Sequence, residues 1–220
     1  MRITWYGHAA FRIETQGLAI ILDPYRSPDS GGYEPIGEGA DIVIVSHEND
    51  RYHSHLGQIR SPFRLVRALE LPPEGMEIEG IHFKAVRVYE SPERRANEQV
   101  AIVHFWREGL HLVFLGDLGH PLGPDELAPL RLASIVLVPA GGPPTIALSE
   151  IPPLLDAISP KLVIPMHFKT PKINLPIQPL ERFLEHFGRD PIHQLGTPTI
   201  EVSSNSLPQQ RTIVILDHAR

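Results

Sequence analysis

The sequence predicts a layered α/β or α+β fold in which short helices cover β-sheets. Two observations support this prediction. Apolar runs of strand length dominate the first part of the 220-residue chain, and strand-like runs alternate with helix-like segments later. Twenty-three prolines and 17 glycines separate these runs, which indicates many short elements. No internal repeat, low-complexity tract or linker is present, so a single domain over residues 1–220 is expected.

The first part of the chain reads as strands joined by turns. The segments expected to be strands are a pair around Gly7 in residues 2–15, the run "LAIILDPY" that stops at Asp23, "ADIVIV" before Ser46, a pair around Gly80 in residues 76–90, and a hairpin over residues 99–117.

The second part alternates between the two kinds of element. Helices are predicted over residues 123–131, 148–158 and 178–188, the last closed by Gly188 as a C-cap glycine. Strands are predicted over residues 134–142, 161–168, 199–203 and 211–218.

Composition narrows the class of function. The net charge is −6 and no basic stretch stands out, which argues against a nucleic-acid partner. The absence of cysteine excludes disulfides, thiolate zinc sites and cysteine nucleophiles. No apolar run is long enough to cross a bilayer, and the start of the chain lacks the apolar region of a signal peptide. We therefore expect no membrane partner and a cytoplasmic location.

Four apolar runs end at side chains that commonly bind metals. These are His47, Glu90, Asp117 and His167. A histidine or an acid at the end of one strand is more often a turn or cap residue. If all four strand ends met at one edge of a layered fold, however, they would form a metal or catalytic centre. Imidazole and carboxylate ligands suit zinc or manganese.

Six motifs in order, "WYGHAAF", "ILDP", "VSH", "LGDLGH", "VPAGG" and "IPMHFKT", make the chain resemble the metallo-β-lactamase superfamily. The resemblance is closest to its small single-domain Zn-dependent hydrolases, which are related to the ascorbate-phosphate lactonases. It implies a four-layer αβ/βα sandwich with two sheets face to face and the active site at one sheet edge. It also implies two metal sites, built from an H-x-H-x-D-H pattern, a later histidine, the aspartate of "GD" and a last histidine.

The pattern that the resemblance implies is incomplete in this chain. His47, Asp117 and His167 match it, whereas the second histidine, the aspartate, the third histidine and the later histidine are replaced by Asn49, Arg51, Tyr52 and Glu90. Arginine has no lone pair to offer a cation and cannot act as a general base. We therefore expect at most one zinc or manganese ion per chain, or none.

Several arrangements of the polar loop remain open. His53 or His55 could replace a missing ligand if the loop shifts its register. His47, Glu90 and Asp117 could hold one metal with water, with a weak contribution from the Asn49 carbonyl. Alternatively, Arg51 could form a salt bridge to Asp117 or Glu90 in place of a metal. The competing arrangement has Arg51 pointing into solvent, because long charged side chains are seldom buried.

Three further residues are expected around the site. His8 is expected to form structural hydrogen bonds near it, and His120 to line the pocket. Asp23 either orients a metal ligand or forms a turn before Pro24. Two functions remain: a hydrolase of a lactone, ester or phosphoester, or a non-catalytic binding or scaffold protein. In both cases the ligand is an unidentified small molecule, and an oligomer is compatible with the sequence.

Overall fold

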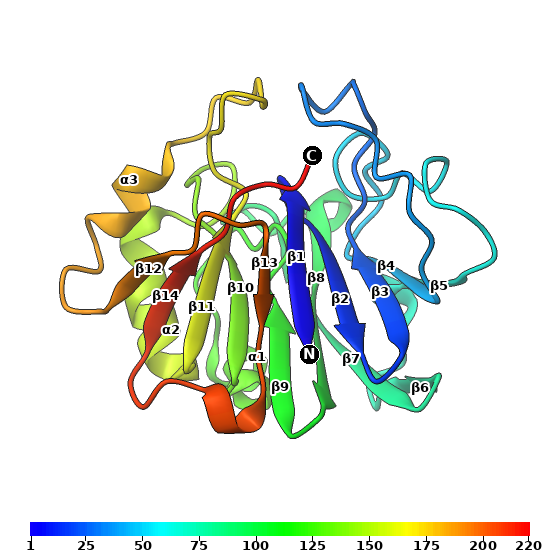
Figure 1. The fold of residues 1–220 in the computed structure, drawn as a ribbon. Helices are drawn as coiled ribbons and strands as arrows, with labels where there is room; N and C mark the ends of the chain where they lie inside the picture. The colour runs from blue at the N-terminus through cyan, green and yellow to red at the C-terminus, as the bar shows by residue number, and fades with distance from the viewer.

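The computed structural model describes residues 1–220 and contains two β-sheets that lie face to face (Figure 1). The first sheet has six strands in the order β13-β1-β2-β3-β4-β5. Their bounds are β1 (Arg2–Gly7), β2 (Ala10–Thr15), β3 (Leu18–Leu22), β4 (Ile42–Val45), β5 (Arg64–Arg67) and β13 (Thr199–Glu201). Strands β3, β4 and β5 run parallel to one another.

The second sheet has eight strands in the order β12-β14-β11-β10-β9-β8-β7-β6. Their bounds are β6 (Met76–Ile78), β7 (Ile81–Tyr89), β8 (Gln99–Arg107), β9 (Leu110–Phe114), β10 (Ile135–Pro139), β11 (Leu162–Met166), β12 (Ile192–Gln194) and β14 (Thr212–Ile215). The run from β9 through β10, β11 and β14 to β12 is parallel, so the carboxyl ends of these strands share one edge.

The main core lies between the sheets and under the helices. It joins 52 buried residues from both sheets. In the first sheet the side chains alternate, because Trp5 and Phe11 belong to this core while Tyr6 and Ala10 face the other way. In the second sheet, β10 and β11 are buried at every position. Continuous burial of this kind is typical of parallel strands that are covered on both faces.

The helices are few and short. Helix α2 (Ile151–Ile158) buries Ile151, Leu154, Leu155 and Ile158, a helical spacing that places one face in the main core. The other helices are α1 (Pro124–Leu127) and α3 (Leu180–Leu184). Because α3 ends at Leu184, the predicted C-cap role of Gly188 is wrong. None of these helices has the length and apolar character that crossing a membrane requires.

The predicted sandwich is confirmed, although loops cover the outer face of the six-stranded sheet. A separate cluster of 11 buried residues packs loop side chains such as Tyr25, Tyr33 and Ile36 against that face. The loops that follow β1, β4, β9 and β11 gather at the upper end of the sandwich in Figure 1. This is the end at which the sequence places its potential metal ligands.

Candidate metal centre

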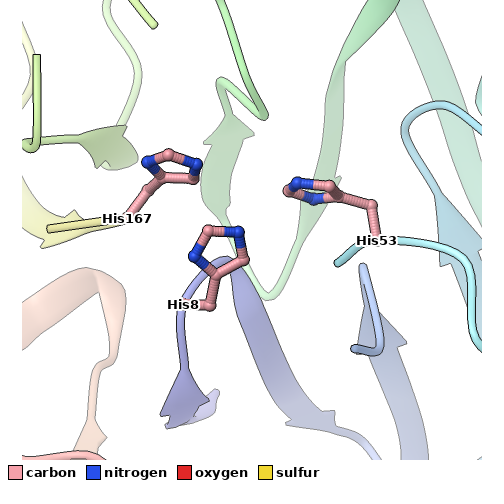
Figure 2. A group of neighbouring side chains, drawn as sticks. All are labelled: His8, His53 and His167. Carbon is pink, nitrogen blue, oxygen red and sulfur yellow. The ribbon is translucent and has the colours of Figure 1, made fainter. Parts of the chain in front are cut away.

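Histidines from both sheets meet at this end of the sandwich. His8 lies in the turn between β1 and β2, His53 in the loop after β4, and His167 directly after β11. Figure 2 shows their three rings facing a common space. The ring of His8 lies 4.2 Å from that of His167 and 5.1 Å from that of His53, measured between centroids. Each ring offers a nitrogen within 4.8 Å of the other two.

The backbone adopts an unusual conformation at three of these positions. His8, Asp23 and His167 have φ angles of 51°, 41° and 50°, in the left-handed region that non-glycine residues seldom occupy. Such strain costs about 1–3 kcal/mol per residue and concentrates at functional sites. The His8 carbonyl accepts hydrogen bonds from the His167 amide at 2.9 Å and from the Trp5 indole at 3.0 Å, which ties the two sheets together here.

His53 lies between two buried carboxylates. Its Nδ1 is 3.0 Å from Asp23 Oδ2, and its Nε2 is 2.9 Å from Asp117 Oδ2. Burial lowers the pKa of His53, but the Asp117 charge and hydrogen bonds to both acids outweigh burial and raise the pKa to about 10. Burial alone would raise the pKa of Asp117, yet the neighbouring histidines hold it well below its usual value. Without a metal, the raised pKa favours a protonated His53, whose single positive charge offsets one of the two carboxylate charges.

Asp23 is fixed from its other side by Ser46. The Ser46 amide donates to Asp23 Oδ1 at 2.7 Å, and the Ser46 hydroxyl donates to Asp23 Oδ2 at 2.6 Å. Asp23 thereby holds Nδ1 of His53, which turns Nε2 of His53 toward Asp117. A carboxylate behind a histidine is the usual device that orients a metal ligand. The expected orienting role of Asp23 fits this geometry.

Several buried polar atoms in the cluster have no hydrogen-bond partner. They are both ring nitrogens of His8, Nε2 of His47, Nδ1 of His167 and Oδ1 of Asp117. A buried unsatisfied polar group costs about 1–3 kcal/mol, so such groups are rare in native proteins unless they have a use. Burial also lowers the pKa values of His8, His47 and His167, which favours the neutral imidazoles that metals bind.

The residues therefore fit a divalent cation. The set supplies neutral imidazoles, buried carboxylates and unpartnered lone pairs, which is the chemistry that zinc or manganese takes. His47 belongs to the set because its ring lies 4.5 Å from that of His53, and its nitrogen groups with those of Asp23 and His53. His167 Nε2 lies 3.6 Å from Asp117 Oδ1. Three of the four predicted ligands, His47, Asp117 and His167, thus surround His53.

The expected salt bridge from Arg51 to Asp117 or Glu90 is wrong. Arg51 is exposed, and its Nε donates to the Asp29 carbonyl at 2.6 Å. The cause is a tight turn in which the Asn49 carbonyl accepts hydrogen bonds from the amides of Tyr52, His53 and Ser54. This turn directs His53 inward and Arg51 outward, so His53 becomes the cation between the acids. The structure therefore turns His53 toward the cluster, which is the side-chain direction that the shifted-register arrangement requires.

The other predicted residues differ in how close they lie to the cluster. Glu90 is half-buried, and both burial and the nearby Asp117 charge raise its pKa. His55 bonds to Asp50 at 3.0 Å near the surface, away from the cluster. His120 is buried, accepts from the Tyr89 amide at 3.2 Å, and donates to the Pro121 carbonyl at 2.8 Å. Asn49 acts through its backbone, as described above, rather than as a metal ligand.

Comparison with known proteins agrees with this architecture. Residues 2–167 match the family model described as a β-lactamase superfamily domain. A UPF0173 protein of Pyrococcus abyssi is 29% identical, with 77% of this chain and 84% of that protein covered. A protein of Methanopyrus kandleri named as a UPF0173 metal-dependent hydrolase is 27% identical over 89% of this chain and 93% of its own length.

Solved structures show the same fold. A metallo-β-lactamase superfamily chain from Thermotoga maritima has a TM-score of 0.79 and 29% identity, covering 98% of this chain and 97% of its own. A metallo hydrolase of Ignicoccus hospitalis shares the fold with a TM-score of 0.60 at 16% identity. Because the family model spans well over half of the chain and the sandwich agrees with it, this protein belongs to the β-lactamase superfamily domain family and has the metallo-β-lactamase fold.

Proposed function

We propose that this protein is a metal-dependent hydrolase that acts on a lactone, ester or phosphoester. The observation that carries the proposal is the buried cluster of imidazoles and carboxylates whose lone pairs have no partner within the chain. The name of the Methanopyrus kandleri relative supports the same class of activity. The single ion is zinc or manganese, and His47, His53, Asp117 and His167 are the residues that would hold it.

A cation bound there would supply positive charge that polarises the scissile carbonyl or phosphoryl group and makes water more acidic. The chain contributes the rest. Asp23 and Ser46 keep the His53 ring in place, and His8 packs against His167 to exclude water from one side. Glu90, whose pKa is raised by burial and by the nearby Asp117 charge, is the candidate general acid for the leaving group.

One observation favours a second candidate, a non-catalytic binding protein. His53 already lies against both Asp23 and Asp117 and offsets part of their negative charge without a metal. A cation held by His53 and Asp117 would have to displace their 2.9 Å contact, and His53 would have to release its proton to become a ligand. The choice between the two functions therefore depends on whether a metal displaces this contact.

Elemental analysis of untagged protein purified without chelator tests the proposal, together with hydrolysis of a lactone, an aryl ester and an aryl phosphodiester. We expect about one equivalent of zinc or manganese and metal-dependent hydrolysis of at least one substrate. Asp117→Asn and His167→Gln should each lower metal affinity and activity by about 100-fold or more. His55→Gln is the matched control, because His55 lies outside the cluster and should change neither.

Stoichiometric metal together with hydrolysis would support the enzyme. Protein that takes up no metal after incubation with zinc and manganese, and hydrolyses none of the three substrate classes, would refute the proposed hydrolase and support the binding protein.

A further inference from the structure

We propose that Arg51 and Tyr52 form a subsite at the rim of the candidate metal centre that recognises an anionic oxygen group, a carboxylate or a phosphate, on the substrate. This inference rests on the proposed function and deepens it. It assigns the substrate to a narrower class, in which an anionic group stands apart from the bond that is hydrolysed.

Tyr52 connects the rim to the histidine cluster. Its side chain is half-buried, and its ring lies 5.2 Å from the ring of His8 and 6.4 Å from that of His53, between centroids. The Arg51 guanidinium carbon lies 5.1 Å from the centre of the same ring. A guanidinium over an aromatic ring is held in place by a cation–π contact. Arg51 is thus linked to His8 through the Tyr52 ring.

The Arg51 side chain is held at one end and free at the other. Its Nε donates to the Asp29 carbonyl at 2.6 Å, while its two terminal nitrogens make no hydrogen bond or ion pair in the structure. The Asp29 carboxylate forms its ion pair with Arg26, at 2.8 Å, and not with Arg51. The free edge of a guanidinium is a planar pair of donors that fits a carboxylate or phosphate.

The acids on the same loop have other partners. Asp50 pairs with Arg26 at 2.7 Å, and Glu48 pairs with Arg67 at 2.7 Å. Arg51 is the arginine of this loop, and none of these carboxylates lies within ion-pair distance of its guanidinium. An exposed ion pair contributes little to stability, so these pairs matter here chiefly because they leave Arg51 available.

The separation between Arg51 and the cluster defines the geometry of the substrate. Arg51 contacts the Tyr52 ring, which contacts the His8 ring, and Arg51 makes no hydrogen bond or ion pair with a candidate metal ligand, so a group bound by Arg51 is distinct from the group at those ligands. The substrate therefore needs two ends: a scissile bond at the cluster and an anion at the rim. Dicarboxylates imitate this arrangement, because one carboxylate can occupy the cluster while the other reaches Arg51.

Isothermal titration with two matched pairs of acids tests the subsite: adipate against hexanoate, and suberate against octanoate. Each pair differs in its second carboxylate. We expect at least one dicarboxylate to bind the wild type about tenfold more tightly than its monocarboxylate, a ratio that one charge-assisted contact supports. Arg51→Gln should abolish this ratio and leave monocarboxylate binding unchanged. Arg67→Gln, which removes the same charge from a paired arginine nearby, should keep it.

An equal ratio in the wild type and Arg51→Gln overturns the proposal, as does an equal loss in both variants, which would indicate only long-range charge. Failure of both dicarboxylates to bind the wild type also overturns it. The hydrolase proposal is judged separately by metal content and hydrolysis. The titrations are repeated on metal-free protein, where loss of dicarboxylate binding in Arg51→Gln still reports the subsite.

Discussion

Replacing His53 by leucine should cost about 3–5 kcal/mol of unfolding free energy in metal-free protein at pH 7, because it leaves two buried carboxylates without their cation. His53 is 1% exposed and contacts Asp23 at 3.0 Å and Asp117 at 2.9 Å. Leucine has nearly the same volume as histidine, so the loss is electrostatic rather than a cavity effect.

The magnitude follows from the pKa of His53. Folding raises it from 6.5 to about 10. At about 1.36 kcal/mol for each pKa unit, the stabilisation has a ceiling of about 5 kcal/mol. The lowered pKa of Asp117 expresses the same attraction and is not added. Since the folded pKa is raised, the stabilisation is complete below pH 6.5 and is lost as the pH rises through about 10.

Urea denaturation in EDTA between pH 6.5 and 10 measures both effects. The wild type should lose stability across this range, and His53→Leu should lose much less. His104→Leu is the matched control, because His104 is also buried but its partner is His111 at 3.2 Å rather than a carboxylate. It should keep the wild-type slope over this range. A cost below about 1 kcal/mol for His53→Leu, or the same slope in both proteins, would refute the reasoning.

Three further predictions concern single contacts. Gly119→Ala should lower the free energy of unfolding by about 3 kcal/mol or more in urea denaturation, because the added Cβ would lie 1.7 Å from the Glu90 carbonyl oxygen. Gly188→Ala is the control and should change little, because no atom lies within 4 Å of the added Cβ. Ser46→Ala removes a 2.6 Å hydrogen bond to Asp23 and should weaken metal binding about tenfold in a chelator competition; unchanged affinity would contradict the role of Asp23. Burial lowers the pKa of His104 from 6.5 to about 4, so the free energy of unfolding of the wild type should decrease as the pH falls from 6.5 to 4. His104→Leu should lose less stability over this pH range. The same pH dependence in both proteins would contradict a neutral buried His104.

Much of the fold was predictable because hydrophobic pattern and burial agree. Strands β10 and β11 are continuous apolar runs and are buried at every position. The two strands that were not expected, β5 (Arg64–Arg67) and β12 (Ile192–Gln194), are short and largely exposed, so they carry little hydrophobic signal. Helix α3 ends at Leu184, although apolar residues continue at helical spacing as far as Phe187. The hydrophobic pattern therefore predicts a longer helix than the backbone forms.

The candidate site was harder to predict, because a loop reverses the direction of its side chains within a few residues. The strand-end positions of His47, Asp117 and His167 followed from the apolar runs before them, and the structure brings these residues together. The positions of Arg51 and His53 depend on the backbone turn at Asn49, which no periodicity reveals. The signal that was available is the Asn-Asp pair at positions 49 and 50, which is typical of a tight turn.

The division of the cluster between two sheets links ligand binding to the opening of the fold. His8, His47 and His53 belong to the six-stranded sheet or its loops, whereas Asp117 and His167 follow strands of the eight-stranded sheet. A partly opened molecule in which the sheets separate at this end would lose the complete set of donors. A ligand that contacts residues of both sheets therefore lowers the population of the opened molecule, and this population falls further as the ratio of ligand concentration to dissociation constant rises. Protease resistance of the loops after β4 and β11 should then rise with occupancy, which makes cleavage rates a measure of binding that needs no substrate.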